Sequence, residues 1–387
     1  MQVLNWRPQL LILYKLEAVS LAPKYPRIFS IASQLKAGRG FTVSATMLHG
    51  DLMELESDII LARQLLRTSM IEEDLNGFCK ILATRNPIEA INILLQTVGL
   101  GNLKANTVML SWPEDWQLSN ERNKVFIETL RLAYAKKIAI IVPVNIDSFP
   151  TNNTVMTGKI DIWWIIHDGG MLLLLAFLLK QHPVWKKCRL RIITVTAKKS
   201  TPEELIKLKE KMLKYLYEIR IDAEVLVEEI SVQNLQAYVS IVKSNKKRVK
   251  RSISTALQDI VETVRGVSQE EEDDEDDEDD IAFKSDIEES QVKEDIFEKD
   301  EDEEDKSSSS DEMIHWRMEI AKKLNESVKS MSAQSSLILM NIPSPPNLQI
   351  SEHLIRTYMK YLACLTDGLQ RVMLVHGSGT EVVTGLQ

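Results

Sequence analysis

Residues 106–144 contain the pattern that decides the fold. They read NTVMLSW (106–112), then an amphipathic stretch (120–135), then KIAIIVPV (137–144). An apolar run, a helical periodicity and a second apolar run predict one strand–helix–strand unit. The second run does not alternate polar and apolar residues, which is typical of a strand that is covered on both faces of a parallel sheet.

The same unit recurs toward the N-terminus. Strands are predicted at residues 8–16 (PQLLILYKL), 40–48 and 77–83, with helices at 24–36, 52–72 and 87–98. Five strands with helices between them predict an α/β fold with a mainly parallel sheet. The polar stretch 149–157 (FPTNNTVMT) then indicates a boundary.

A second βα series follows this boundary. It has predicted strands at residues 161–166, 189–196, 223–229, 335–341, 371–376 and 381–384, and predicted helices at 171–181, 201–220, 231–243, 313–331 and 351–365. The fold class is therefore α/β, with two βα-layered subdomains and mainly parallel sheets.

An acidic insert interrupts the second series. Residues 270–305 hold twenty-three acids and three lysines, which gives this segment a net charge of −20. Since the whole chain has a net charge of −9, the rest of the chain carries +11. Such a segment cannot bury enough apolar area to offset its chain entropy, which predicts disorder. The expected organisation is a first subdomain (1–150), a second subdomain in two parts (151–244 and 313–387) and a disordered basic and acidic insert (245–312).

The most apolar stretch, residues 162–179, resembles a membrane span but is interrupted. His167, Asp168, Gly169 and Gly170 stand at its middle, where an ionised Asp would be costly in a bilayer. The better interpretation is a buried strand, a structural turn at Asp168, Gly169 and Gly170, and a buried helix, with Asp168 as the helix cap. The alternative is that His167 and Asp168 form an acid–base pair.

Catalytic motifs are scarce. The sequence has no GxSxG, HExxH, Walker A or complete GxGxxG motif, which favours a protein that is not an enzyme. The three cysteines (Cys79, Cys188 and Cys364) are far apart, so neither structural zinc nor a disulfide framework is expected, and a reducing cytosolic setting fits.

Two short motifs are candidate binding or modification sites. The stretch LKAGRG, which includes Lys36, Gly38, Arg39 and Gly40, could cradle a phosphate with backbone N–H groups, or it is a glycine helix end with flanking cations. The serines before Asp311 and Glu312 are candidates for acid-directed phosphorylation, or they belong to a solvated linker. These serines are Ser307, Ser308, Ser309 and Ser310.

The basic run 246–251 (KKRVKR) has several possible partners. It could bind acidic lipid headgroups, the acidic run of the same chain, or nucleic acid. The adjacent acidic segment disfavours nucleic acid, which is not expected as a partner.

Several strings, in order, resemble the cation–chloride cotransporter family. They are NWRPQL (5–10), SQLKAGRG (33–40), NTVMLSWP (106–113), IDIWWIIHDGG (160–170), VWKKC (184–188) and RVMLV (371–375). The first string is similar to the junction that follows the last membrane helix of that family. The histidine before DGG, and the wording of the first two strings, resemble the potassium–chloride branch.

This resemblance implies a cytosolic regulatory and assembly domain at the cytoplasmic face of the plasma membrane, with a first subdomain similar to universal stress proteins. The implied partners are the protein's own transmembrane domain, a homodimer mate, and regulatory kinases and phosphatases. No cofactor is required, although ATP or ADP is implied as a regulatory ligand in some members, which would place phosphate at Lys36, Gly38, Arg39 and Gly40. A nucleotide-binding or hydrolysing stress-protein-like protein is the alternative.

The sequence departs from the family at three places. Arg39 stands where a lysine is expected, Ile320 stands where the family has a late regulatory threonine, and the final VVTGLQ is unlike the usual end. Direct phosphorylation at position 320 is therefore not expected, and dimer contacts could differ.

Overall fold

The computed structural model describes residues 6–36, 40–101, 103–165, 170–197, 202–230, 306–346 and 352–378. The predicted helix 231–243, the predicted strand 381–384 and residues 245–305 of the predicted insert therefore fall outside the described residues. The chain separates into two units by its internal contacts, residues 1–242 with 317–387, and residues 243–316. The fold described below is that of the first unit.

The first half of the chain forms five main strands with a helix between each successive pair. The strands are β1 (Leu10–Leu13), β2 (Thr42–His49), β3 (Phe78–Thr84), β6 (Thr107–Leu110) and β7 (Ala139–Val144). The helices are α1 (Arg27–Lys36), α2 (Glu56–Glu72), α3 (Pro87–Thr97) and α4 (Asn120–Ala135). A short hairpin, β4 (Gly99–Leu100) and β5 (Leu103–Lys104), was not predicted, and a 3₁₀ turn (Ile146–Ser148) follows β7.

The second half repeats this plan. Its strands are β8 (Lys159–Trp164), β9 (Arg189–Ala197), β10 (Glu224–Ile230), β11 (Leu337–Asn341) and β12 (Val372–His376). Its helices are α5 (Met171–Gln181), α6 (Pro202–Glu218), α8 (Lys306–Ser332) and α9 (Glu352–Thr366). Helix α8 begins before the predicted start at Met313, inside the stretch that was expected to be disordered. The bounds of α5 agree with the prediction.

The two series join in a single sheet. Within the described residues its order is β10-β9-β8-β11-β12-β7-β6-β1-β2-β3, so each half has the order third, second, first, fourth, fifth. All neighbours within a half are parallel, whereas β12 and β7 pair antiparallel, with Val372 opposite Val144. The mixed α/β class and the mainly parallel pairing were predicted correctly. The edge-to-edge junction was not predicted.

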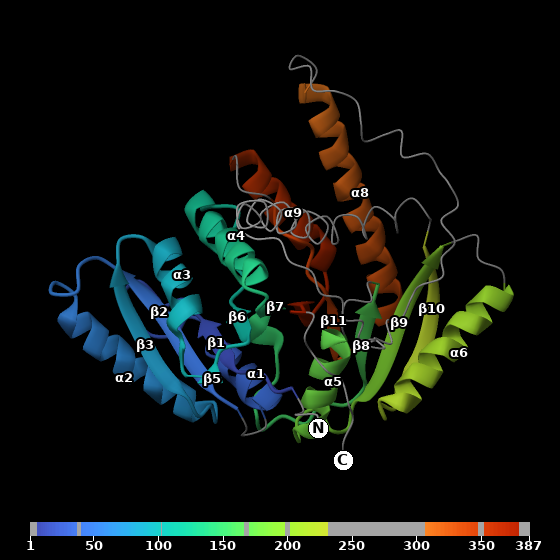
Figure 1. The fold of residues 1–387 in the computed structure, drawn as a ribbon, viewed down its shortest axis with the longest axis horizontal. Helices are drawn as coiled ribbons and strands as arrows, with labels where there is room; N and C mark the ends of the chain where they lie inside the picture. Colours follow the sequence, from blue (N-terminus) through green and yellow to red (C-terminus); the bar gives the residue numbers. More distant parts are fainter. Residues whose placement is uncertain are drawn as a thin grey trace, which may run out of the picture. The chain divides into compact units, whose positions relative to one another are not determined.

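Helices cover both faces of the sheet and bridge the junction between the halves. On one face α1 contacts α5, and on the other α4 contacts α9 (Figure 1). Alternate residues of β1 enter two different hydrophobic cores, Leu10 and Ile12 on the α1 side, Leu11 and Leu13 on the α4 side. Strands buried on both faces explain why the apolar runs of the sequence do not alternate.

None of the described helices is long and apolar enough to cross a membrane. The apolar stretch 162–179 instead supplies the end of β8 and most of α5. Eight of the eleven α5 residues are buried, because this helix packs against the sheet and against α1.

Candidate functional site

A pocket of about 650 Å³ lies at the carboxyl ends of β1, β2 and β6. Strand order reverses between β1 and β6, since β2 follows on one side of β1 and β6 lies on the other. Crevices at such switch points are where ligands bind in open α/β sheets. The pocket is therefore the first half's best candidate for a ligand site.

Ionic and polar side chains line one wall of this pocket. Asp115 pairs with Lys15 at 3.2 Å and with Arg122, and the hydroxyl of Tyr25 donates to Glu114 at 2.7 Å. Within the described part of the chain, the hydroxyl of Ser111 has no hydrogen-bond partner. The Ser111 hydroxyl is itself buried, and both carboxylates of this wall are already engaged.

These contacts also shift two pKa values. Burial, with the neighbouring cations Arg122 and Lys24, lowers the pKa of Lys15, and Glu114 opposes this shift. Burial and the hydrogen bond to Glu114 raise the pKa of Tyr25. Neither group pairs with a nucleophile, and no cluster of His, Cys, Asp or Glu among the described residues could hold a metal ion.

Of the predicted phosphate residues, Lys36 and Gly40 lie at the opposite end of the strands. Lys36 ends α1, and its Nζ donates to the carbonyl of Asn76 at 3.1 Å, ahead of β3. Gly40 precedes β2 with φ +87°, and a Cβ there would lie 2.9 Å from the carbonyl oxygen of Pro8. Close packing and a positive φ explain why position 40 is glycine. The Lys36 ammonium already has a hydrogen-bond partner in the Asn76 carbonyl. Gly38 and Arg39 lie outside the described residues.

A buried polar cluster, here called the interlobe hub, joins the two halves near Lys36. It consists of Gln34, Asn152 and Trp185. The Gln34 side chain donates to the Pro150 carbonyl at 3.1 Å and to Asn152 at 3.0 Å, and it accepts from the Trp185 indole at 2.7 Å. Gln34 has no exposed area. Gln34 and Trp185 belong to SQLKAGRG and VWKKC, so two of the singled-out strings meet in one interaction.

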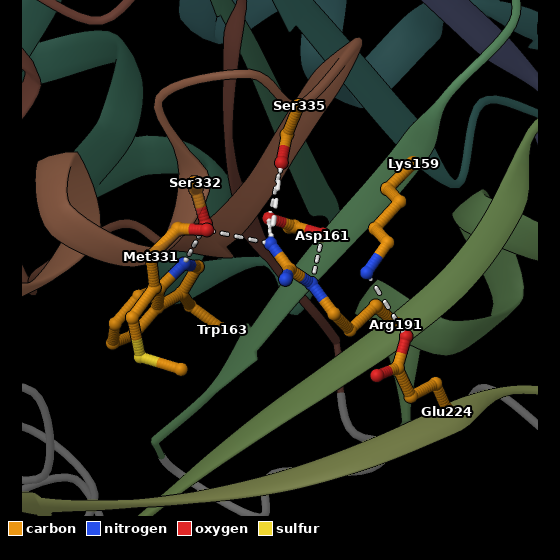
Figure 2. A network of polar contacts seen from close by, with 8 residues as sticks. All are labelled: Lys159, Asp161, Trp163, Arg191, Glu224, Met331, Ser332 and Ser335. Carbon is orange, nitrogen blue, oxygen red and sulfur yellow. Dashed lines mark hydrogen bonds and ion pairs between the residues drawn. The ribbon is translucent and has the colours of Figure 1, made fainter.

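A second network holds the end of α8 to the second half-sheet. Asp161 on β8 is fully buried and accepts from Arg191 Nε on β9 at 2.8 Å, and Arg191 also donates to the carbonyl of Met331 at 2.7 Å. Ser335 donates to Asp161, and the Trp163 indole donates to Ser332 at 3.0 Å. Figure 2 shows that the guanidinium of Arg191 lies between Asp161 and the last turn of α8.

The remaining predicted residues have structural positions. Gly170, rather than the predicted Asp168, occupies the N-cap position of α5, with φ +77° and no side-chain capping hydrogen bond. Asp168 and Gly169 lie outside the described residues. The candidate phosphoserines 307–310 lie in the first turns of α8. Ile320, at the position of the family's late threonine, is 1% exposed and packs in the core of the α4 side.

Sequence reasoning missed the pocket, the interlobe hub and the Arg191 network. The pocket had one usable signal, because Lys15 and the string SWPED lie at the carboxyl ends of two predicted buried strands, and such ends meet at one edge of a parallel sheet. The other two had none, since their residues are far apart in sequence.

Comparison with known proteins defines the class. The family model of Solute carrier family 12 (SLC12) matches residues 25–147 and 142–386. The chain belongs to Solute carrier family 12.

Two solved structures resemble the fold at low sequence identity. The cytoplasmic domain of a prokaryotic cation chloride cotransporter is 13% identical, with a TM-score of 0.45 over 97% of this chain and 98% of that chain. A universal stress protein from Archaeoglobus fulgidus DSM 4304 is 9% identical, with a TM-score of 0.42 over 96% of this chain and 97% of that chain.

Proposed function

We propose that this chain is the cytosolic regulatory and assembly domain of an electroneutral potassium–chloride cotransporter. The observation that carries this proposal is the family match, which extends over residues 25–147 and 142–386. The choice of branch rests on the wording of NWRPQL and SQLKAGRG and on His167 before DGG. In this proposal the domain controls transport and performs no chemistry of its own.

The branch is tested by ion dependence. The full transporter that contains this chain is expressed in cells, and chloride-dependent rubidium uptake is measured with and without sodium. A potassium–chloride cotransporter takes up rubidium equally well without sodium. Uptake that requires sodium would place the protein in the other branch and leave its family unchanged.

The mechanism that we propose has three parts. The first half docks to the transmembrane domain near residues 5–8, the second half pairs with a homodimer mate, and kinases and phosphatases act on Ser307–Ser310. A phosphate in the first turns of α8 adds negative charge at a helix N-terminus, where it is favourable. Replacing the four serines with Glu, and separately with Ala, is expected to change uptake in opposite directions. Equal uptake by both variants would exclude this switch.

A second candidate function is regulatory binding of ATP or ADP. The pocket supports it, because 650 Å³ at a switch point suits a small ligand. Titration calorimetry of the chain with ATP tests it, with Arg122→Ala for the pocket and Lys36→Ala for the LKAGRG site. Loss of binding in only one variant identifies the site, and turnover of ATP would favour the enzyme alternative. No heat of binding with either nucleotide would end this proposal.

A further inference from the structure

The string VWKKC contains two lysines that the fold does not use. Val184, Trp185 and Cys188 are at most 1% exposed, because they close the core beneath α5. Lys186 and Lys187 between them are exposed, and neither forms an ion pair with another described residue. Packing thus explains the buried members of the string and leaves the two cations unexplained.

Two arginines stand beside these lysines. Arg189 begins β9, and Arg220 lies in the turn before β10; both are exposed and neither has an ion-pair partner among the described residues. Strands β9 and β10 are parallel neighbours, with Arg191 opposite Glu224, so the segments that precede them lie side by side.

Few acids oppose these cations. Glu224 is paired with Lys159 at 3.1 Å, and Asp222, Glu218 and Asp74 are further carboxylates near this corner, the last close enough to act on His182. Among these described residues, four cations against three carboxylates leave this corner with a positive net charge.

Exposed apolar side chains adjoin the cations. Helix α6 ends at Glu218, and its last turns expose 85% of Tyr217 and 44% of Leu213, next to the exposed Lys214. We call this surface the basic–aromatic patch: Lys186, Lys187, Arg189, Leu213, Lys214, Tyr217 and Arg220. Cations around an exposed aromatic ring are the composition of a surface that binds at a membrane interface.

The described chain begins close to this patch. The guanidinium of Arg7 donates to the side chain of Gln181 at 3.3 Å, and Gln181 lies five residues before Lys186. If residues 5–10 follow a membrane helix, as the proposed function holds, the loop that carries Lys186 and Lys187 lies on the side of the domain that faces the bilayer.

We propose that the basic–aromatic patch binds the anionic phospholipid headgroups of the membrane. This inference rests on the proposed function for its orientation. Lys186, Lys187, Arg189, Lys214 and Arg220 attract the negative surface, and Tyr217 enters the headgroup layer. Each basic residue near an anionic surface contributes about 1 kcal/mol, a factor of about five in binding. Contact with lipid would hold the domain at a fixed orientation beneath the transporter.

Vesicle binding by the 387-residue chain tests the proposal. Co-sedimentation of the chain is measured with vesicles of phosphatidylcholine alone and with vesicles that also contain roughly 30 mol% phosphatidylserine, which is about the anionic lipid content of a cytoplasmic leaflet. Binding is expected only with phosphatidylserine and should weaken as salt is raised. The double variant Lys186→Glu/Lys187→Glu is expected to bind at least ~25-fold more weakly.

A matched control separates the patch from the overall charge. Lys124→Glu/Lys360→Glu makes the same charge change at exposed sites on α4 and α9, outside the patch. This control should bind like the unmodified chain, whereas Tyr217→Ser should weaken binding without any change in net charge. Equal losses in the control and in the patch variant would overturn the proposal.

The alternative occupant is an acidic polypeptide, and a further arm detects it. Soluble polyglutamate is titrated against the same variants. Tight polyglutamate binding that requires Lys186 and Lys187, with no binding to phosphatidylserine vesicles, would overturn the lipid proposal. Because these assays measure no transport, their outcome is independent of the rubidium test of the proposed function.

Discussion

Arg191 on β9 and Asp161 on the adjacent strand β8 form an ion pair, and the carboxylate of Asp161 is completely buried. The guanidinium of Arg191 also donates to the carbonyl of Met331 at the end of α8. The first α8 residues follow the acidic segment directly in sequence. This ion pair therefore fixes the place where the chain rejoins the sheet.

Removing one partner of this pair is expected to be costly. Arg191→Met leaves Asp161 buried without its cation, and the free energy of unfolding should fall by about 3–5 kcal/mol. The double variant Asp161→Leu/Arg191→Met should lose less than Arg191→Met alone. Urea unfolding followed by tryptophan fluorescence measures both. A single variant as stable as the parent would show that the pair does not hold this corner of the sheet.

Gln34 is expected to couple the two halves through the interlobe hub. Gln34→Leu keeps the volume but leaves the Trp185 indole and the Asn152 side chain without this partner, at a cost of about 1–3 kcal/mol. Hydrogen exchange should increase in α1 and in the segment that carries Trp185. Gln64→Leu on the exposed face of α2 is the control and should leave exchange unchanged. Exchange that rises only in α1 would mean that the hub does not link the halves.

Gly40 is expected to be required for packing. Gly40→Ala combines a left-handed φ with a Cβ 2.9 Å from the Pro8 carbonyl, whereas Gly101→Ala has a positive φ but open space around it. In both variants the strained backbone conformation should lower the free energy of unfolding by about 1–2 kcal/mol. In Gly40→Ala the clash with the Pro8 carbonyl should lower it further. Thermal unfolding of the two variants gives the comparison. Equal losses would show that the Pro8 backbone moves aside.

Lys36 predicts a pH dependence of stability. Burial lowers its pKa from the ordinary 10.5 to about 8, so between these values the unfolded chain binds the proton more readily than the folded one. The stability of the parent relative to Lys36→Met should therefore rise as the pH increases from about 8 to 10.5. Paired urea titrations at several pH values measure this difference. A difference that stays constant with pH would contradict a lowered pKa.

Local sequence pattern predicted the elements well, for reasons visible in particular residues. The apolar run that begins at Met171 could form only a buried helix after Gly170, and the bounds of α5 confirm this. Runs such as IAII in β7 indicated a strand covered on both sides. In contrast, the sequence around Val144 and Val372 gives no indication that these residues pair across an antiparallel junction.

The candidate sites were harder to predict because they depend on contacts between distant residues. Gln34 and Trp185 are 151 positions apart, and Asp161 and Ser335 are 174 positions apart. Polar residues such as these satisfy each other only after the sheet has formed, so neither residue carries a local signal. Lys36 and Gly40 belong to the string LKAGRG, which is consistent both with a phosphate-binding loop and with a glycine helix end. The described contacts give a packing reason for each of the two residues.

The position of the long segment between β10 and β11 has an evolutionary consequence. It departs from the outermost strand of the sheet and returns, through α8, to an interior one. Doubling the length of such a connection raises the entropic cost of closing it by only about 0.6 kcal/mol. Descendants of an ancestral gene can therefore gain, lose or rewrite regulatory sequence at this point while every strand keeps its neighbours.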